Sequence, residues 1–239
     1  MAMRTHAYPA SYLEAISPKH LPPNKLHQKL ALRAVQTMRA SFDLATGYSH
    51  GKAMAEGHWL RRIIFLETIA GVPGMVAGML RHLRSLRLMQ RDNGWINTLL
   101  EEAENERMHL LTFMEMRQPG VLFRGMVIVA QAVFFSAFAG SYMVSPKFCH
   151  AFVGYLEEEA VKTYTQALQE IDAGRLWRAK PAPPIACYYW GLPEGASMRQ
   201  LVLAVRADEA HHSHVNHTFA RLPQDGPNPF VSKDSHMVP

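Results

Sequence analysis

Two glutamates that stand alone and two Glu-x-x-His pairs constrain the fold of this chain more than any other feature. In chain order the residues are Glu67, Glu106 with His109, Glu157, and Glu209 with His212. Residues at i and i+3 of a helix lie one turn apart on one face, so each pair can direct a carboxylate and an imidazole to one centre. We expect the two lone glutamates to supply the bridges between two such centres. The pattern therefore predicts a site for two metal ions enclosed by helices.

The spacing raises this pattern above chance, because roughly one Glu-x-x-His pair would occur at random in a chain of this composition. The steps from 67 to 106, 106 to 157 and 157 to 209 are 39, 51 and 52 residues, each enough for a helix and its connection. Glu67 lies in the apolar run 63–70, where an ionised carboxylate needs a partner such as a metal ion. Solvated helix-face glutamates are the more common case, but they fit that run poorly. Four helices with this ligand set resemble ferritin-like di-iron and di-manganese proteins.

The chain is organised as one helical domain. Its 239 residues suffice for one sizeable core, and nothing like an interdomain linker interrupts residues 46–222. We predict an N-terminal arm at 1–24, a di-iron bundle at 25–222 and a poorly ordered tail at 223–239. The stretch 71–74 contains two glycines and a proline, yet apolar periodicity resumes after it, so we expect a kinked rather than an ended helix. No strand alternation is found, which predicts an all-α protein.

Two segments, 63–80 and 125–145, are apolar enough to resemble membrane spans. The first contains Glu67, which must share a buried site with Glu106 on a polar helix, so it is not expected to cross lipid. The second either packs on the bundle or lies in one leaflet as an anchor, and we favour the anchor. The complete prediction is a ferritin-like four-helix bundle with a di-iron centre plus two additional membrane-associating helices, at about 25–45 and 121–145.

The chain carries a formal net charge of +5 without a motif for nucleic acid, a P-loop or a dinucleotide-binding glycine pattern. We therefore expect no nucleic-acid partner. Basic residues recur at helical spacing in 25–45, which is also amphipathic, and in 81–91, and both stretches can meet anionic headgroups. A solvated helix face is the alternative for 81–91. Only Cys149 and Cys187 are present, in apolar surroundings, so metal ligands must be oxygen and nitrogen, which suit iron or manganese.

Four local sequences carry a family resemblance. They are Leu66-Glu67-Thr68, Asn105-Glu106-Arg107-Met108-His109-Leu110, Leu156-Glu157-Glu158-Glu159-Ala160 and Arg206-Ala207-Asp208-Glu209-Ala210-His211-His212. They resemble the four signature boxes of the alternative oxidases, over roughly residues 25–222. The resemblance implies a cyanide-insensitive, haem-free enzyme on one face of a membrane. It would oxidise two ubiquinols and reduce O2 to two waters, without proton pumping, at two iron ions. The implied iron ligands are Glu67, Glu106, His109, Glu157, Glu209 and His212.

The resemblance also implies roles around the metals. Tyr164 matches the family's redox-active or proton-donating tyrosine, although a buried tyrosine of the core is the alternative. The family's outer hydrogen-bond network corresponds to Asn105, His150, Tyr189, Trp190 and Asp208. Its quinol pocket corresponds to Arg62, Leu66, Glu159, Ala160 and Thr163. Of the three glutamates 157–159 the first is taken as the ligand, a choice that helical geometry permits and does not make by itself.

Other interpretations stay open. A di-iron quinone (demethoxyubiquinone) hydroxylase shares the ligand order, a plastoquinol oxidase is a close relative, and a ferritin-like iron-storage or ferroxidase bundle is the alternative from another class. His211, His214 and His217 suggest a second metal site, but we expect them to face solvent or to bind backbone carbonyls.

The expected partners are ubiquinol, O2, one membrane leaflet and a second copy in a non-covalent homodimer. Before residue 25 only Arg4 and Lys19 carry fixed positive charge, which is poor material for a mitochondrial transit peptide. The first expectation is therefore the cytoplasmic face of a bacterial cytoplasmic membrane, and the alternative is the matrix face of the mitochondrial inner membrane.

Overall fold

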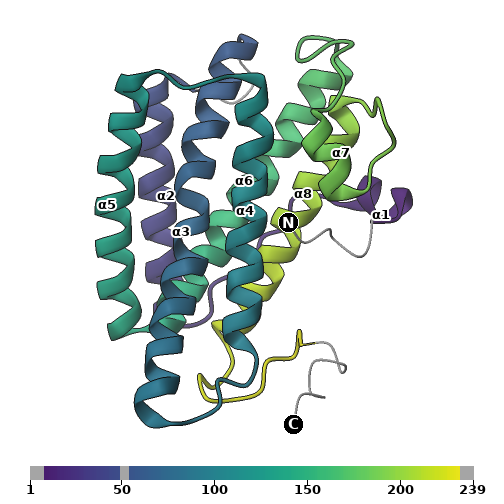
Figure 1. The fold of residues 1–239 in the computed structure, drawn as a ribbon. Helices are drawn as coiled ribbons and strands as arrows, with labels where there is room; N and C mark the ends of the chain where they lie inside the picture. Colours follow the sequence, from purple (N-terminus) through teal and green to yellow (C-terminus); the bar gives the residue numbers. More distant parts are fainter. Residues whose placement is uncertain (1–7, 49–53, 232–239) are drawn as a thin grey trace.

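The computed structural model describes residues 8–48 and 54–231, so parts of the predicted arm (1–7) and tail (232–239) lie outside the described residues. Those residues form helices joined by loops, with one isolated β-bridge between Pro181 and Ser197 (Figure 1). The helices are α1 (Ala10–Ala15), α2 (Leu26–Thr46), α3 (Glu56–Leu88), α4 (Trp95–Met116), α5 (Val121–Val144), α6 (Pro146–Asp172), α7 (Pro184–Trp190) and α8 (Met198–Phe219). The prediction of an all-α protein is confirmed.

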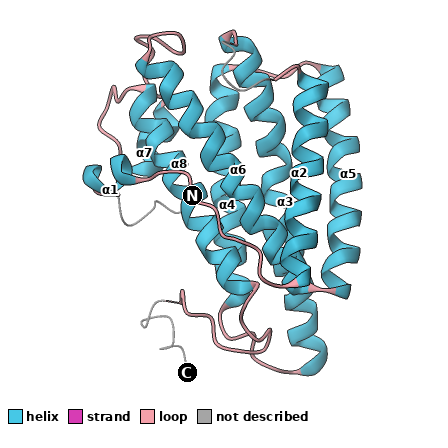
Figure 2. Ribbon diagram, turned by 180° about the vertical axis from the view of Figure 1, so that it is seen from behind, coloured by secondary structure: helices cyan, strands magenta, loops and turns pink. Residues whose placement is uncertain are grey.

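Four long helices make the bundle that will hold the site. Helix α3 packs along α4, and α6 packs along α8. The two pairs meet through contacts of α3 with α6 and of α4 with α8. Outside this bundle, α2 lies on α6 and α5 lies on α3, so both flank one side (Figure 1). Helices α1 and α7 lie on the opposite side, as the view from behind also shows (Figure 2). The two additional helices predicted at 25–45 and 121–145 correspond to α2 and α5.

Local signals explain where the helices begin and end. Ser197 accepts a hydrogen bond from the Gln200 amide, and the Gln200 side chain reaches back to Ser197, which is a capping box at the start of α8. Ser145 caps α6, where Pro146 occupies the first helical position. Gly47 ends α2 with φ 65°, in the left-handed region that glycine adopts at little cost.

Two glycines let α3 and α4 approach closely. Helix α3 continues through Pro73, as predicted. A Cβ atom at Gly74 would lie 2.5 Å from the carbonyl oxygen of Leu99, and one at Gly71 would lie 3.3 Å from that of Ala103. Because neither glycine has a side chain, the backbones of the two helices can approach closely. This close contact sets the separation of Glu67 from Glu106.

We expect Gly74→Ala to destabilise the protein by about 1–3 kcal/mol, because the added methyl group must push α3 away from α4. The midpoint of thermal unfolding, followed by circular dichroism, should fall by roughly 2–4 °C per kcal/mol. Gly125→Ala in α5 is the matched control, because nothing lies within 4 Å of its added Cβ. Equal midpoints for the two variants would contradict this account of the contact.

The predicted poorly ordered tail is wrong for residues 223–231. Trp95 Nε1 donates to the Gly226 carbonyl at 2.8 Å, and Asn228 Nδ2 donates to the Gly94 carbonyl at 2.9 Å. The Phe230 ring lies edge-on to Phe219, with centroids 5.8 Å apart. This segment is held by hydrogen bonds to Gly94 and Trp95 and by a ring contact with Phe219, and contacts of this kind leave no periodic pattern in the sequence.

The basic stretch 81–91 does not act as one surface. Arg81 is buried, pairs with Asp92 at 2.7 Å and lies over the Trp95 ring at 4.3 Å. Arg84 is half-exposed and pairs with Asp225 at 2.6 Å. Arg81 therefore belongs to the packing of the helix end, and the prediction that it meets headgroups is wrong.

Candidate metal centre

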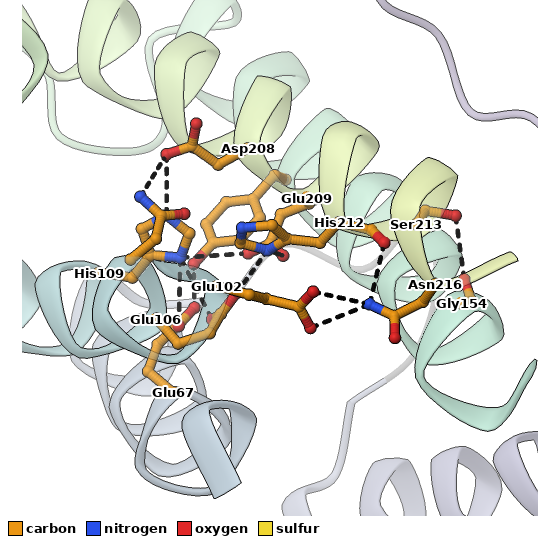
Figure 3. A network of polar contacts seen from close by, with 12 residues as sticks. Glu67, Glu102, Glu106, His109, Gly154, Asp208, Glu209, His212, Ser213 and Asn216 are labelled. Atoms are coloured by element: carbon orange, nitrogen blue, oxygen red, sulfur yellow. Dashed lines mark hydrogen bonds and ion pairs between the residues drawn. The ribbon is translucent and has the colours of Figure 1, made fainter. Parts of the chain in front are cut away.

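The six predicted ligand residues lie together in the middle of the bundle. Figure 3 shows Glu67, Glu106, His109, Glu209 and His212. Helix α3 supplies Glu67, α4 supplies Glu106 and His109, α6 supplies Glu157, and α8 supplies Glu209 and His212. All six are buried. They form two groups, each able to offer ligand atoms within 4.8 Å of one another: Glu67, Glu106, His109 and Glu209, and then Glu106, Glu157, Glu209 and His212.

The shared residues of the two groups are Glu106 and Glu209. These carboxylates can bridge two ions, whereas Glu67 and Glu157 each belong to one group. The sequence-based expectation that the lone glutamates supply the bridges is therefore reversed. Spacing along a helix does not say how deeply each helix reaches into the bundle, so the bridging positions could not be taken from sequence.

The inner atoms of this cluster are buried and have only one another as close polar neighbours, without a hydrogen bond of good geometry. They are Glu67 Oε2, both carboxylate oxygens of Glu106, Glu209 Oε2, and the Nδ1 atoms of His109 and His212. Glu106 lies between the imidazoles, with Oε1 at 2.7 Å from His212 Nδ1 and Oε2 at 3.4 Å from His109 Nδ1. Buried polar atoms normally have partners, so converging acceptors of this kind indicate a cradle for cations. Carboxylate oxygen and imidazole nitrogen fit iron or manganese.

Burial and the closeness of the charged groups to one another shift the pKa values within the cluster. Burial raises the pKa of Glu67 to about 8 and raises the pKa of Glu157 well above its usual range. Burial opposes the charged form of His212, but the carboxylates of Glu106 and Glu209 outweigh it and raise the His212 pKa to about 10. Burial also opposes ionisation of Glu106, yet His109 and His212 hold its pKa well below the usual range. When no cation is bound, bound protons therefore neutralise part of the negative charge of the carboxylates.

We expect the metal-free protein to lose stability as the pH rises from 5 to 8. Glu67, with a pKa of about 8, and Glu102, with a pKa raised by burial to about 7, keep protons in the folded state that the unfolded state releases near pH 4.5. Stability therefore falls with pH, by about 1.4 kcal/mol per pH unit for each such carboxyl, until the pH reaches the folded-state pKa of that group. Denaturant melts of chelator-treated protein at each pH would measure this. Iron-loaded protein should not follow the trend, and a flat profile for the metal-free protein would contradict it.

Asp208 supports His109 from outside the cluster. It is fully buried, and its Oδ2 accepts from Trp190 Nε1 at 2.8 Å and from Asn105 Nδ2 at 2.9 Å. The same oxygen lies 3.2 Å from His109 Nε2, which leaves His109 Nδ1 facing the cluster. Asn105 also donates to the Tyr189 hydroxyl at 3.1 Å. A carboxylate behind a metal-binding imidazole fixes its ring and tautomer.

One member of this network was missed and one lies elsewhere. Tyr8, in the N-terminal arm, donates its hydroxyl to Asp208 Oδ1 at 2.9 Å. No sequence pattern signals this bond, because the two residues are 200 positions apart. The predicted member His150 does not reach Asp208. It contacts Asn216 and Tyr142, on another side of the cluster.

Tyr164 lies directly against the cluster. Its buried hydroxyl donates a short hydrogen bond to Glu67 Oε1. Burial raises the Tyr164 pKa well above its usual range, and Glu67 adds to the shift. The residue is therefore a neutral phenol with its proton aimed at a candidate ligand.

A cavity of about 200 Å³ reaches the cluster between α2, α3 and α6. Most of its wall is apolar, and its inner end includes Glu67, Glu106, Glu157 and Glu209. Of the predicted quinol-pocket residues, Leu66, Glu159, Ala160 and Thr163 line it. Arg62 does not. Its buried guanidinium pairs with Asp43 and donates to Thr46 Oγ1 at 2.8 Å, so it is neither pocket wall nor surface charge.

Arg39 occupies the place that Arg62 was expected to take. It lines the cavity and donates to Thr163 Oγ1 at 3.1 Å and to Glu159 Oε2 at 3.3 Å. Asp43 accepts from Arg39 Nε at 2.8 Å, while Arg39 Nη2 is buried without a partner. From sequence, Arg39 belongs to the basic stretch 25–45 that was expected to meet the membrane, because it recurs at helical spacing with the other basic residues of that stretch.

The spare histidines do not form a second metal site among the described residues. His211 and His214 are exposed, as expected. His217 is buried, and its Nε2 lies 2.8 Å from Glu158 Oε1. The expectation of a solvent-facing or carbonyl-bound side chain is wrong for His217, because its face of α8 turns toward α6.

Two described helices are long and apolar enough to cross a membrane by length and composition, Glu56–Leu88 and Val121–Val144. In α3 44% of the apolar window is buried inside the protein, against 6% in α5. Helix α3 is therefore a core helix, whereas most of the apolar window of α5 is not covered by the described residues.

Comparison with known proteins gives one consistent result. The family model described as Alternative oxidase matches residues 8–221. A mitochondrial alternative oxidase of Aspergillus niger is 54% identical over 239 residues, covering 95% of this chain and 68% of the relative. That of Emericella nidulans is 53% identical over 237 residues (94% and 67%). That of Ajellomyces capsulatus is 56% identical over 220 residues (85% and 62%).

Proposed function

The chain belongs to the alternative oxidase family, and on this premise we propose that it oxidises ubiquinol and reduces O2 to water at a di-iron centre. The observation that carries the proposal is the pair of overlapping ligand groups, whose buried carboxylate and imidazole atoms face one another at the inner end of an apolar cavity. Two quinols would supply the four electrons that O2 needs. Two iron ions held there would supply the electron transfer and O2 activation.

The protein residues bind and orient these partners. Glu67 with His109 would hold one ion, Glu157 with His212 the other, and Glu106 with Glu209 both. Asp208 keeps the Nδ1 atom of His109 directed inward. Tyr164 can give or share its hydroxyl proton at Glu67 Oε1, next to the place where oxygen would be reduced.

The cavity suits a quinol. Its apolar wall fits the ring and the first part of an isoprenoid tail. Arg39, Glu159 and Thr163 place a guanidinium, a carboxylate and a hydroxyl along one edge, where they can hydrogen-bond the two quinol oxygens. Arg62 and Asp43 hold Arg39 from behind, so Arg62 serves this pocket indirectly.

Helices α2 and α5 form the proposed membrane surface. Exposed apolar side chains on α2 include Leu26 (72%) and Leu44 (85%), and those on α5 include Val121 (88%) and Val129 (64%). A patch of this kind on a family of quinol enzymes fits binding to one leaflet, from which the hydrophobic substrate would come. Assembly into a non-covalent homodimer remains a prediction from the family resemblance.

We expect Val129→Glu to weaken membrane binding, because a carboxylate on α5 would have to enter the apolar part of the leaflet. Flotation with anionic vesicles should recover clearly less of this variant than of the unchanged protein. Gln169→Glu adds the same charge at an exposed site of α6 and should float normally. Equal recovery of both variants would argue against α5 as the anchor.

The relatives favour the second of the two expected locations. All three reported above are mitochondrial alternative oxidases. We place the protein at the matrix face of the mitochondrial inner membrane, and the first expectation, a bacterial cytoplasmic membrane, has no support among them.

Oxygen uptake tests the proposed reaction. Purified, iron-loaded protein in detergent is given a short-chain ubiquinol in the presence of cyanide, and quinone formed is measured against O2 consumed. Two quinones per O2 support the oxidase. No quinol-dependent uptake by protein with two irons per chain would contradict it, and mass analysis of a demethoxyquinone would then test the hydroxylase.

A further inference from the structure

We propose that Asn216 is a positioning residue for His212, and that Glu102 and His150 hold its side-chain amide in one orientation. The proposal rests on the proposed function, since His212 matters as a metal ligand only if the cluster holds metals. These residues form a second buried hydrogen-bond branch, separate from the branch at Asp208. Figure 3 shows Asn216 between Glu102 and His212.

One amide joins three helices. Asn216 is buried on α8, one turn after His212, and its Nδ2 donates to the His212 carbonyl at 3.1 Å. The same nitrogen donates to Glu102 on α4, at 2.8 Å to Oε2 and 3.0 Å to Oε1. Its Oδ1 lies 3.1 Å from His150 Nδ1 on α6. The position of the His212 turn is thereby tied to α4 and α6.

The partners fix which way the amide points. The His212 carbonyl oxygen can only accept a hydrogen bond, so the amide nitrogen of Asn216 must face it, and with it Glu102, while the amide oxygen faces His150. His150 Nδ1 then carries a proton, and its Nε2 can accept from the Tyr142 hydroxyl, 3.2 Å away. Burial lowers the His150 pKa to about 4, which keeps the ring neutral and suited to this role.

His212 needs such support more than His109 does. Asp208 holds the His109 ring directly through Nε2. Among the described residues no outer carboxylate holds the His212 ring in this way, and its Nδ1 faces the cluster, 2.7 Å from Glu106 Oε1. The direction of its Nδ1 therefore depends on where its helical turn sits. The Asn216 side chain ties that turn to both α4 and α6.

This placement makes the support selective. His212 and Glu157 belong to one ligand group, while His109 and Glu67 belong to the other. Loss of the Asn216 bonds should weaken the ion held by the first group and leave the second nearly unchanged. A residue that merely stabilised the bundle would affect both ions alike.

Cobalt binding tests the proposal without any measurement of turnover. Purified metal-free protein is titrated with Co²⁺, and the visible absorption of the bound ion is followed. We expect two binding steps for the unchanged protein, and for Asn216→Leu one step weakened about 10–100-fold with the other retained. Glu102→Gln, whose amide oxygen can still accept from Asn216, should bind nearly normally, whereas Glu102→Leu should resemble Asn216→Leu.

Ser213→Ala is the matched control, because it removes another buried bond from α8 to α6, at 3.0 Å to the Gly154 carbonyl. It should leave both steps unchanged. If Asn216→Leu does not fold, Asn216→Asp, of equal size but without the donor, gives the same comparison. Equal weakening of both ions, or none, would overturn the proposal. Selective weakening in a protein that oxidises no quinol would instead leave it standing and remove the proposed function.

Discussion

Glu106→Gln is expected to abolish iron binding and quinol oxidation together. Glu106 belongs to both ligand groups, and its two oxygens face His109 on one side and His212 on the other. A neutral amide of the same size keeps the packing but removes the charge that both ions would share. Iron per chain should fall from two to near zero, with a loss of activity of roughly 100-fold or more, beyond the effect of changing an outer partner.

Glu104→Gln controls for the loss of a carboxylate from the same helix. Glu104 is half-exposed and pairs with Arg107 at 2.6 Å, and exposed pairs of this kind contribute little. Its iron content and activity should match those of the unchanged protein. A Glu106→Gln protein that still held two irons would show that the shared carboxylate is not the bridge.

Tyr164→Phe is expected to keep two irons and lose most of the activity. The change removes the hydroxyl that donates to Glu67 Oε1, while the ring still fills its place beside Phe113. Loss of a group that transfers a proton in the reaction typically costs 10²–10⁴-fold. Turnover with a short-chain ubiquinol, measured beside the iron content, separates this loss from a loss of metal.

Tyr155→Phe is the matched control. Tyr155 lies on the same helix, is equally buried, and its hydroxyl has no hydrogen-bond partner among the described residues. Its variant should be fully active. Full activity of Tyr164→Phe would remove any catalytic role for that hydroxyl, and a parallel fall in iron would assign it to the structure of the site.

Sequence patterns predicted the parts of the fold that repeat along one helix. The segments expected at 25–45 and 121–145 match α2 (Leu26–Thr46) and α5 (Val121–Val144) closely. The Glu-x-x-His spacing likewise predicted that Glu106 and His109 would face one centre, which needs only the geometry of a single turn.

Contacts between distant segments were the part that sequence could not supply. The bridging positions depend on the depth of each helix in the bundle, and the choice between Arg39 and Arg62 depends on how α2 rotates against α6. Tyr8 and Asp208, like Asn228 and Gly94, meet through single hydrogen bonds across 200 and 134 positions. Such bonds leave no periodic trace in the chain.

The bond from Tyr8 to Asp208 has a practical consequence for anyone who prepares this protein. An affinity tag or a protease that displaces Tyr8 would also remove a hydrogen bond from the carboxylate behind His109. Trimming the N-terminus would then act on metal occupancy, although the cut lies far from every ligand in sequence. Preparations are better tagged after residue 231, and iron content should be checked whenever the arm is shortened.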